Sequence, residues 1–169
     1  MDAKHGKVKI LGGSAVKGIL RRMAYEIYEK NFDQKKLVII GIGKRGGYLA
    51  QQILEILKEI SPLDLQLFLA AKTEGDGIAL LKEAIDSISG EPILIVDDVL
   101  YSGITMFHAL AAVMNCNPLA VQIAVLIDRG HRSVPVSHDF VGMELATSLK
   151  QYVSVEISAA EQKANAYLY

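Results

Sequence analysis

The stretch Ile93-Leu94-Ile95-Val96-Asp97-Asp98-Val99-Leu100-Tyr101-Ser102-Gly103-Ile104-Thr105 decides how the rest of the 169-residue sequence is interpreted. It begins with four apolar residues, which predict a buried strand. Two adjacent carboxylates follow, and after them come two hydroxyl side chains, a glycine and the start of a helical pattern. Adjacent carboxylates repel each other, so the end of a buried strand is a poor place for them unless a ligand binds there.

The residue types in this stretch indicate which ligand that is. Asp97 and Asp98 only accept hydrogen bonds and offer oxygen ligands, which suit a ribose diol and a hard cation such as Mg²⁺. Ser102 and Thr105 add hydroxyls, and the free N–H groups that begin a helix at Ile104–Met114 make a site for phosphate. The alternative is a solvated turn whose polar residues only cap the helix. The complete strand–loop–helix pattern favours a sugar-phosphate site.

Strands and helices alternate along the rest of the chain. The segments that we expect to form strands are Leu37–Ile40, Leu65–Leu69, Ile93–Val96, Val121–Ile127 and Tyr152–Ile157. Helices are expected at Ser14–Tyr28 with Ser14 as N-cap, after Gly47, at Ile78–Ile88 and at Ile104–Met114, with a turn at Thr73–Gly77 and an irregular segment at Arg129–Ser148. This alternation predicts a three-layer α/β fold in which helices flank a mostly parallel sheet. The length fits a single domain, residues 1–169.

A second unusual segment, Gly41–Gly47, contains four glycines with Lys44 and Arg45 between them. Glycine allows backbone amides to approach an anion closely, and two cations offset the charge of a pyrophosphate. Glycine-rich turns between strands and helices are common, so this signal is weak by itself. Both this segment and the acidic loop leave the carboxyl end of an expected strand, where ligands of parallel sheets bind. We therefore expect the two segments to face one crevice.

Composition narrows the class of protein. The formal net charge is −1, which argues against a global basic field for nucleic acid and leaves room for a local basic patch. The longest apolar runs are strand-sized, whereas a membrane-spanning helix needs about 20 residues. The polar segment Met1–Lys9 lacks the apolar core of a signal peptide, and the only cysteine, Cys116, excludes an internal disulfide. We expect a cytoplasmic protein without a membrane partner.

The motifs together resemble a known family. Val96–Thr105 closely resembles the phosphoribosyl pyrophosphate signature of type I phosphoribosyltransferases. Within that superfamily the chain looks most like the PyrR family, whose members are bifunctional pyrimidine-operon attenuators and uracil phosphoribosyltransferases. Gly41–Leu49 is similar to that family's pyrophosphate loop, and Ile10–Tyr28 to its first helix. Ile127–Arg132 is similar to its hood segment, and Ala146–Ile157 has its Thr-Ser and closing strand.

The resemblance implies a role for each matching residue. Asp97 and Asp98 would be the catalytic carboxylates and would hold the ribose hydroxyls, directly or through Mg²⁺. The implied substrate contacts are Tyr101, Ser102, Gly103, Ile104 and Thr105 for the 5-phosphate, Lys44, Arg45 and Gly46 for pyrophosphate, and Asp128, Arg129, Gly130 and His131 for the uracil ring. The implied ligands are phosphoribosyl pyrophosphate and uracil or UMP, and a homodimer with a small hood over the site is expected.

Two departures from the family's pattern bear on activity. The family carries a mobile loop with a Tyr-Arg-Asp-Asp string after the third strand, whereas this chain reads Leu67-Phe68-Leu69-Ala70-Ala71-Lys72-Thr73-Glu74-Gly75-Asp76-Gly77. The arginine is absent, and Lys72 is a point charge without arginine's fork. Ile104 stands where the closest family members have a basic residue.

These departures leave two functions open. The first is an enzyme that makes UMP and pyrophosphate from uracil and phosphoribosyl pyrophosphate. The second is a nucleotide-sensing regulator, with RNA as a further partner, that keeps the ligand site and little catalysis because a closing loop is shortened. Transfer to a purine is less favoured because the hood segment resembles the pyrimidine branch. His131 and Arg132 are either surface residues or part of the base pocket or of an RNA-contact face.

Overall fold

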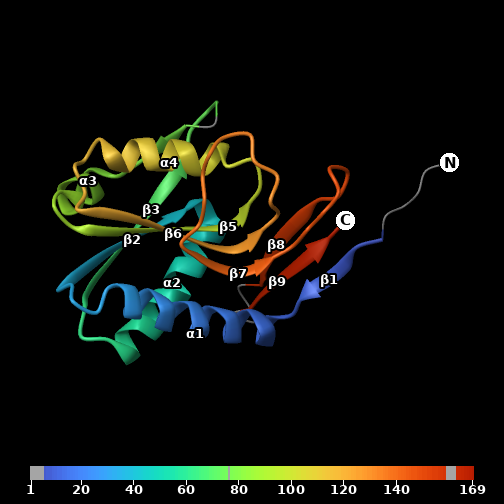
Figure 1. Cartoon of the computed structure of the whole chain (residues 1–169), viewed down its shortest axis with the longest axis horizontal. Coiled ribbons are helices and arrows are strands. Elements are labelled where there is room, and N and C mark those ends of the chain that lie inside the picture. Colours follow the sequence, from blue (N-terminus) through green and yellow to red (C-terminus); the bar gives the residue numbers. More distant parts are fainter. Residues whose placement is uncertain (1–5, 76, 159–162) are drawn as a thin grey trace.

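The computed structural model describes residues 6–75, 77–158 and 163–169, and a six-stranded sheet forms its centre (Figure 1). Its strands are β2 (Lys36–Ile42), β3 (Asp64–Lys72), β4 (Ile78–Ala79), β5 (Pro92–Leu100), β6 (Ala120–Asp128) and β7 (Phe140–Glu144), in the order β4-β3-β2-β5-β6-β7. All neighbouring strands are parallel except β3 and β4, which pair antiparallel. The expected α/β fold with a mostly parallel sheet is therefore confirmed.

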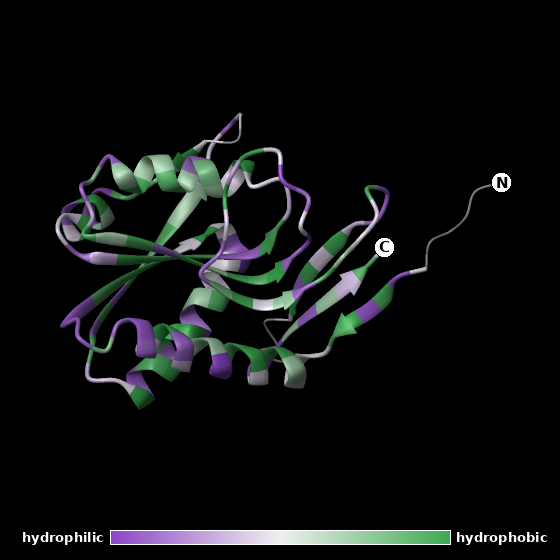
Figure 2. Ribbon diagram, in the orientation of Figure 1, coloured by the Kyte–Doolittle hydropathy of each residue, from purple (hydrophilic) through white to green (hydrophobic). Residues whose placement is uncertain are grey.

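Helices cover both faces of this sheet. They are α1 (Gly13–Lys30), α2 (Gly43–Ile60), α3 (Lys82–Ile88) and α4 (Ile104–Met114). Figure 1 shows α1 and α2 below the sheet and α3 and α4 above it. Because helices cover both faces, both sides of each central strand are buried. The central strands therefore consist of continuous apolar residues, as is usual for buried parallel strands. Figure 2 shows these runs as green ribbon at the centre of the molecule.

Alternate residues of each central strand enter two separate cores. Ile39 of β2 and Leu94 of β5 pack with the buried sides of α1 and α2. Their neighbours Ile40 and Ile95 pack on the opposite face with Met106 of α4. This alternation follows from the two-residue period of a strand, and it fixes the register of β5 against β2. The same register brings the carboxyl ends of β2, β5 and β6 to one edge of the sheet.

A second, smaller sheet stands beside the first. It contains β1 (Val8–Leu11), β9 (Lys163–Leu168) and β8 (Val153–Ser158), all antiparallel and in the order β1-β9-β8. Sequence analysis found part of β8 and neither β1 nor β9. Asp128–His131, the segment expected to lie over the base, is found at the end of β6 and in the loop that follows it.

Several expected boundaries need correction. Ser14 is not an N-cap, because α1 begins at Gly13 and its N-cap is Gly12; the N–H of Gly13 donates to Asn165 Oδ1 (3.0 Å) instead. The helix expected at Ile78–Ile88 divides into the short strand β4 and the helix α3. In the turn at Thr73–Gly77, the N–H of Thr73 donates to the carbonyl of Gly77 (2.9 Å), and residue 76 lies outside the described residues.

The segment expected to be irregular contains the edge strand β7. Helix α1 protects this edge: the Arg22 guanidinium donates to the carbonyls of Val141 (2.9 Å) and Gly142 (2.8 Å). An uncovered edge strand presents free backbone groups that can pair with other chains. The Arg22 contact gives partners to two backbone carbonyls of β7 at this edge.

Within the described residues, no helix is long and apolar enough to cross a membrane.

Candidate active site

Strand β5 continues past the expected end at Val96 and carries both aspartates within it. Its pairing with β2 stops at Val96, opposite Gly41, while its pairing with β6 continues to Leu100, opposite Asp128. The carboxylates therefore lie where β5 has lost one neighbour and helix α2 begins. This gap at the edge of the sheet is where an open α/β sheet binds its ligands.

Asp97 is buried, with 6% of its surface exposed. Burial, and after it the negative charge of Asp98, raise the pKa of Asp97 from 3.8 to about 8. The N–H of Asp98, which donates to Asp97 Oδ1 (2.9 Å), and the positive charge of Lys72 act in the opposite direction. Burial and the neighbouring carboxylate therefore outweigh the nearby positive charge of Lys72, and a carboxyl group perturbed in this way inside a cavity is a candidate functional group.

Asp98 is more accessible and has a partner. Its Oδ2 lies 3.5 Å from Arg45 Nη1, and its side chain is 13% exposed. Arg45 comes from the first turn of α2, so the acidic and glycine-rich segments do face each other. This contact confirms the expected common crevice. Because the Arg45 side chain is 47% exposed, it remains free to turn toward a ligand.

The loop between β5 and α4 encloses the N-terminus of that helix. Gly103 is the N-cap, with a φ of 83°, a left-handed conformation that glycine adopts without strain. Glycine has no side chain that could cap the helix. The N–H of Ile104 donates a long hydrogen bond to Ser102 Oγ (3.4 Å). The hydroxyl of Ser102 therefore makes only a long contact with the first N–H of the helix, and we expect an anion to replace this contact.

These groups line one cavity of about 440 Å³. The predicted site residues that line it are Arg45, Asp97, Asp98, Tyr101, Ser102, Gly103, Thr105 and Arg129. Lys72, at the end of β3, lines it as well and adds a second cation opposite the carboxylates. One cavity thus combines two carboxylates, two cations besides Arg129, the aliphatic hydroxyls of Ser102 and Thr105, and a helix N-terminus.

Three predicted residues lie elsewhere. Lys44 lines two grooves on the other side of α2, beside Leu69. Gly46 packs against β5, where an added Cβ would lie 2.6 Å from the carbonyl oxygen of Val96, so this glycine lets the helix approach the strand. Ile104 begins α4 with 37% of its surface exposed. Their contact with a substrate remains a prediction.

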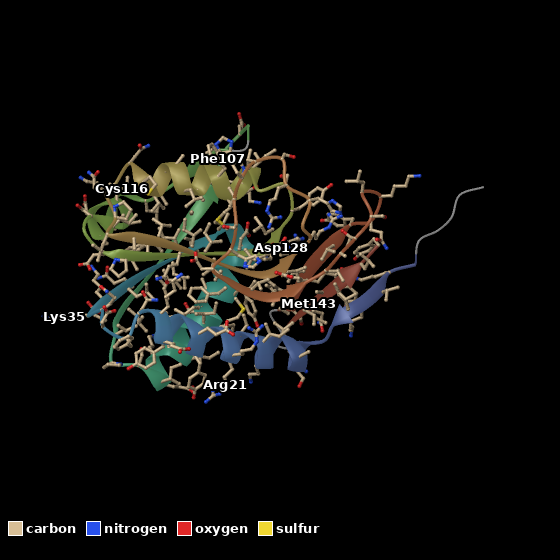
Figure 3. All side chains as sticks on the ribbon, viewed as in Figure 1. Arg21, Lys35, Phe107, Cys116, Asp128 and Met143 are labelled. Carbon is tan, nitrogen blue, oxygen red and sulfur yellow. The ribbon has the colours of Figure 1, made fainter. Side chains whose placement is uncertain are left out.

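A second cavity, of about 600 Å³, adjoins the first. It is lined by Asp128, Arg129, Gly130, His131, Glu144, Leu145 and Ala146. Figure 3 shows Asp128 where β6 ends, on the side of the main sheet nearest the small sheet. The four residues predicted for the base therefore gather in one place, and Arg129 lines both cavities.

The carboxylate of Asp128 is fully engaged within the protein. It accepts hydrogen bonds from the N–H of Gly130 (2.7 Å) and from Arg132 Nη2 (2.6 Å), and His138 Nε2 lies 3.1 Å away. Burial alone would raise the pKa of Asp128, but these bonds and the charge of Arg132 outweigh it and lower the pKa. This carboxylate consequently shapes the pocket wall and has little capacity left for a ligand.

Arg129 is buried, and its guanidinium connects distant segments. Its Nε donates to Thr147 Oγ1 (3.0 Å) and its Nη2 to the carbonyl of Gln151. The guanidinium also lies 4.0 Å from the ring centroid of Tyr101, within the range of a cation–π contact. His131 approaches the edge of the same ring, so Tyr101 is held from two sides.

Sequence analysis missed part of both cavities. Tyr152 and Val153 line the first cavity, while Glu144 and Leu145 line the second. These residues lie far along the chain from the loops they face, and none belongs to a local motif. The Thr-Ser pair and the expected strand Tyr152–Ile157 marked the segment around Tyr152 and Val153 without assigning these residues to the site.

The donor set fits Mg²⁺ when the cation arrives with its substrate. The described residues contain no group of three or more His, Cys, Asp or Glu side chains that could hold a metal ion. Mg²⁺ is usually bound by one or two carboxylates, with the remaining ligands from water and substrate phosphates. Asp97 and Asp98 supply those two carboxylates, and the burial of Asp97 beside Asp98 is a place where a cation would offset their mutual repulsion.

Comparison with known proteins agrees with this geometry. The phosphoribosyl transferase domain family matches residues 9–159. The curated relatives include the bifunctional protein PyrR of Brevibacillus brevis, 38% identical over 166 residues with 92% of each chain covered. The bifunctional protein PyrR of Clostridium acetobutylicum is 34% identical over 179 residues, covering 96% of this chain and 97% of the relative.

Solved structures support the fold at lower identity. A hypoxanthine-guanine phosphoribosyltransferase from Bacillus anthracis superimposes with a TM-score of 0.75 at 18% identity, covering 95% of this chain and 97% of that one. The hypoxanthine phosphoribosyltransferase of Trypanosoma cruzi gives 0.74 at 18% identity, with 81% of each covered. The identity over nearly the full length of both PyrR relatives confirms the family inferred from the Val96–Thr105 signature. This chain belongs to the phosphoribosyl transferase domain family and, within it, to the PyrR family.

Proposed function

We propose that this protein transfers the 5-phosphoribosyl group of phosphoribosyl pyrophosphate to uracil, forming UMP and pyrophosphate. The observation that carries the proposal is the 440 Å³ cavity at the carboxyl end of β5. Its wall contains carboxylates, cations and the N-terminus of α4, which are suited to the ribose, the pyrophosphate and the 5-phosphate. A ligand that lacked any of these three parts would leave one wall without a partner.

Each part of the cavity matches one requirement of the reaction. The bond between the anomeric carbon and a pyrophosphate oxygen breaks, and its electron pair leaves with pyrophosphate. A bond from N1 of uracil to the anomeric carbon forms, and the N1 proton is released. Arg45 and Lys72 stabilise the departing oxygens, while the charge of Asp98 stabilises the positive sugar in the transition state. Tyr101–Thr105 hold the 5-phosphate and so position the anomeric carbon.

We propose that Asp97 holds Asp98 in position. Its burial and its hydrogen bond from the N–H of Asp98 fix the backbone at this position. When Mg²⁺ is bound, it would supply positive charge to both carboxylates and to the pyrophosphate oxygens. Asp97 and Asp98 are the residues that would hold it. The base is proposed to occupy the adjoining cavity beside Asp128–His131, where Arg129 separates it from the phosphate side.

The decisive experiment is a turnover assay with phosphoribosyl pyrophosphate, Mg²⁺ and a panel of nucleobases. We expect UMP formation from uracil and much slower reaction with purines. Turnover with a purine in preference to uracil would overturn the assigned base and keep the reaction class. Another outcome is no turnover with any base at millimolar substrate while UMP still raises the melting temperature of the protein. That result would overturn the proposed enzymatic activity and leave nucleotide binding as the function.

A regulatory role is the second candidate, and the end of β3 favours it. Ala71 and Lys72 pair antiparallel with Ile78 and Ala79, so this segment forms a short hairpin in place of the family's arginine-bearing loop. Such a hairpin leaves the cavity more open to water than a closing loop would. We propose that the protein senses UMP in addition to making it; the relatives' name, bifunctional protein PyrR, is consistent with a second function.

Three further parts of the proposal are open to direct measurement. RNA is proposed as a partner of the regulatory role, and binding to pyrimidine-operon leader RNA that weakens with added salt would support it. A homodimer is expected, and light scattering would test it. The protein is proposed to act in the cytoplasm, and fractionation of cells that express it would test this location.

A further inference from the structure

Arg132 has a position that the assigned chemistry does not explain. It lies in the loop after β6, between the two cavities, and although the structure describes it fully, it lines neither of them. Its side chain is 21% exposed. An arginine without a structural role would extend into water, and an arginine that contacts the substrate would face a cavity. The Arg132 side chain does neither, so its role has to come from the groups that it contacts.

All three nitrogens of the Arg132 guanidinium have partners within the protein. Nε donates to the carbonyl of Val136 (2.9 Å), Nη1 to the carbonyl of Tyr101 (2.8 Å) and Nη2 to Asp128 Oδ2 (2.6 Å). Tyr101 begins the phosphate loop, and Asp128 begins the loop that lines the base cavity. One planar, rigid group therefore connects the walls of the two cavities.

The chain around Arg132 reinforces this connection. The N–H groups of Ser133 (2.8 Å) and Val134 (3.3 Å) both donate to the carbonyl of Ser102. An added Cβ on Gly103 would lie 3.1 Å from Val134 Cγ2, so the side chain of Val134 closely backs the left-handed residue of the phosphate loop. Residues 132–134 thus support the phosphate loop from behind while remaining continuous with the base loop.

We propose that Arg132 is a positioning residue that couples the 5-phosphate loop to the base pocket. A phosphate that orders the loop at Tyr101–Thr105 fixes the carbonyl of Tyr101, and through Arg132 it fixes the carboxylate of Asp128. The base then binds to a pocket whose wall is already ordered, so less entropy is lost on binding. The coupling is reciprocal by thermodynamic linkage. This inference rests on the proposed function, because it takes a phosphoribosyl group and a base as the two ligands.

His138 supplies a matched control. Its Nε2 lies 3.1 Å from Asp128 Oδ2 and 3.5 Å from Glu144 Oε1. It therefore contacts the same carboxylate as Arg132, but its recorded contacts do not reach the phosphate loop. His138→Gln removes one partner of Asp128 and leaves the connection between the loops intact. Arg132→Lys keeps a positive charge and loses the fork, so it can satisfy one loop at a time.

The experiment measures binding of two separate fragments by calorimetry. Uracil supplies the base without the phosphate, and ribose 5-phosphate supplies the phosphate without the base. For the unaltered protein we expect saturating ribose 5-phosphate to strengthen uracil binding by about 5-fold or more, within the usual range of coupling between sites. Arg132→Lys and Arg132→Gln should reduce this factor to about 1, with ribose 5-phosphate affinity changed by less than about 3-fold, whereas His138→Gln should retain it.

The outcomes separate this inference from the proposed function. If the unaltered protein binds both fragments without coupling, the role of Arg132 is wrong and the proposed function stands. If it binds neither fragment, the proposed function fails and the inference fails with it. Coupling that survives in Arg132→Lys, or that is lost equally in His138→Gln, would show that Arg132 only stabilises the loop. Thermal melts identify any variant that is unfolded. If Arg132→Gln is unfolded, the test uses Arg132→Lys alone.

Discussion

Asp97 and Asp128 lie near the ends of neighbouring parallel strands, yet their surroundings are opposite. Asp97 is buried beside another carboxylate, and its pKa is raised to about 8. Asp128 accepts bonds from Gly130 and Arg132, and its pKa is lowered. A carboxylate without a balancing charge is held at a cost in stability that a ligand can relieve, whereas a satisfied carboxylate stabilises the fold. We propose that Asp97 serves a ligand and that Asp128 serves mainly the structure of its loop.

The largest expected effect tests the ligand side of this comparison. Replacing Asp97→Asn and Asp98→Asn together removes both negative charges and both cation ligands. We expect Mg²⁺-dependent affinity for phosphoribosyl pyrophosphate to fall by about 1,000-fold, or about 4 kcal/mol, measured by calorimetry with and without a chelator. The far-ultraviolet circular dichroism spectrum should not change. Unaltered affinity in the double variant would remove these carboxylates from the binding site.

The structural side of the comparison is tested at Asp128. Asp128→Asn deletes the charge that Arg132 and His138 face, leaving a partly buried guanidinium without its ion pair. We expect the free energy of unfolding to fall by about 3 kcal/mol in chemical denaturation at neutral pH. Because the pKa of Asp128 is lowered by folding, this loss should shrink as pH falls below its ordinary value of 3.8. A variant as stable as the unaltered protein would contradict the structural role.

For Asp97 we expect the opposite dependence of stability on pH. Folding raises its pKa, so its carboxyl contributes most to stability below its ordinary value of 3.8, and this contribution declines as pH rises toward about 8. Asp97→Asn removes that decline. We expect the ligand-free variant to be more stable than the unaltered protein near pH 8, and the two proteins to be nearly equal in stability near pH 4. Melting curves across this range measure it; a destabilised variant at pH 8 would refute the pKa assignment.

The smallest expected effect concerns Arg45, whose contact with Asp98 is long and half-exposed. Arg45→Gln should lower pyrophosphate affinity by about 5-fold to 10-fold, or about 1 kcal/mol, because one cation beside the departing oxygens is lost. The unfolding free energy should change by less than about 0.5 kcal/mol, as is usual for an exposed ion pair. Lys44→Gln is the comparison, since Lys44 also was predicted to contact pyrophosphate but lines neither of the two site cavities. An equal effect of both substitutions would indicate general charge screening rather than a local contact.

The parts of the fold that depend on near neighbours in the chain were predictable. The helix at Ile104–Met114 was predicted with its observed bounds, and the apolar runs of β2, β5 and β6 identified the central strands. Continuous apolar character follows from burial on both faces and needs no knowledge of the partner strand. The phosphate loop was predictable for the same reason, because Asp97–Thr105 contains its carboxylates, hydroxyls and helix start in one stretch.

What could not be predicted depends on residues far apart in the chain. Strand β1 pairs with β9, as in Val8 opposite Leu168, and no local pattern indicates a partner at that distance. Gly13 obtains its hydrogen bond from Asn165, which is why Ser14 is not needed as a cap. Glycine content suggested an anion loop at Gly41–Gly47, yet Gly46 also serves the close approach of α2 to β5.

By itself, then, the sequence determined the fold class and the composition of the phosphate loop, because period, apolar run and motif are local properties. Only the tertiary structure decided which carboxylate has a raised pKa and which has a lowered pKa. Asp97 and Asp128 are the same residue type at similar strand ends, and their difference arises from Asp98 on one side and Arg132 on the other. Electrostatic interaction depends on distance and burial in space, and the amino-acid order alone does not specify either.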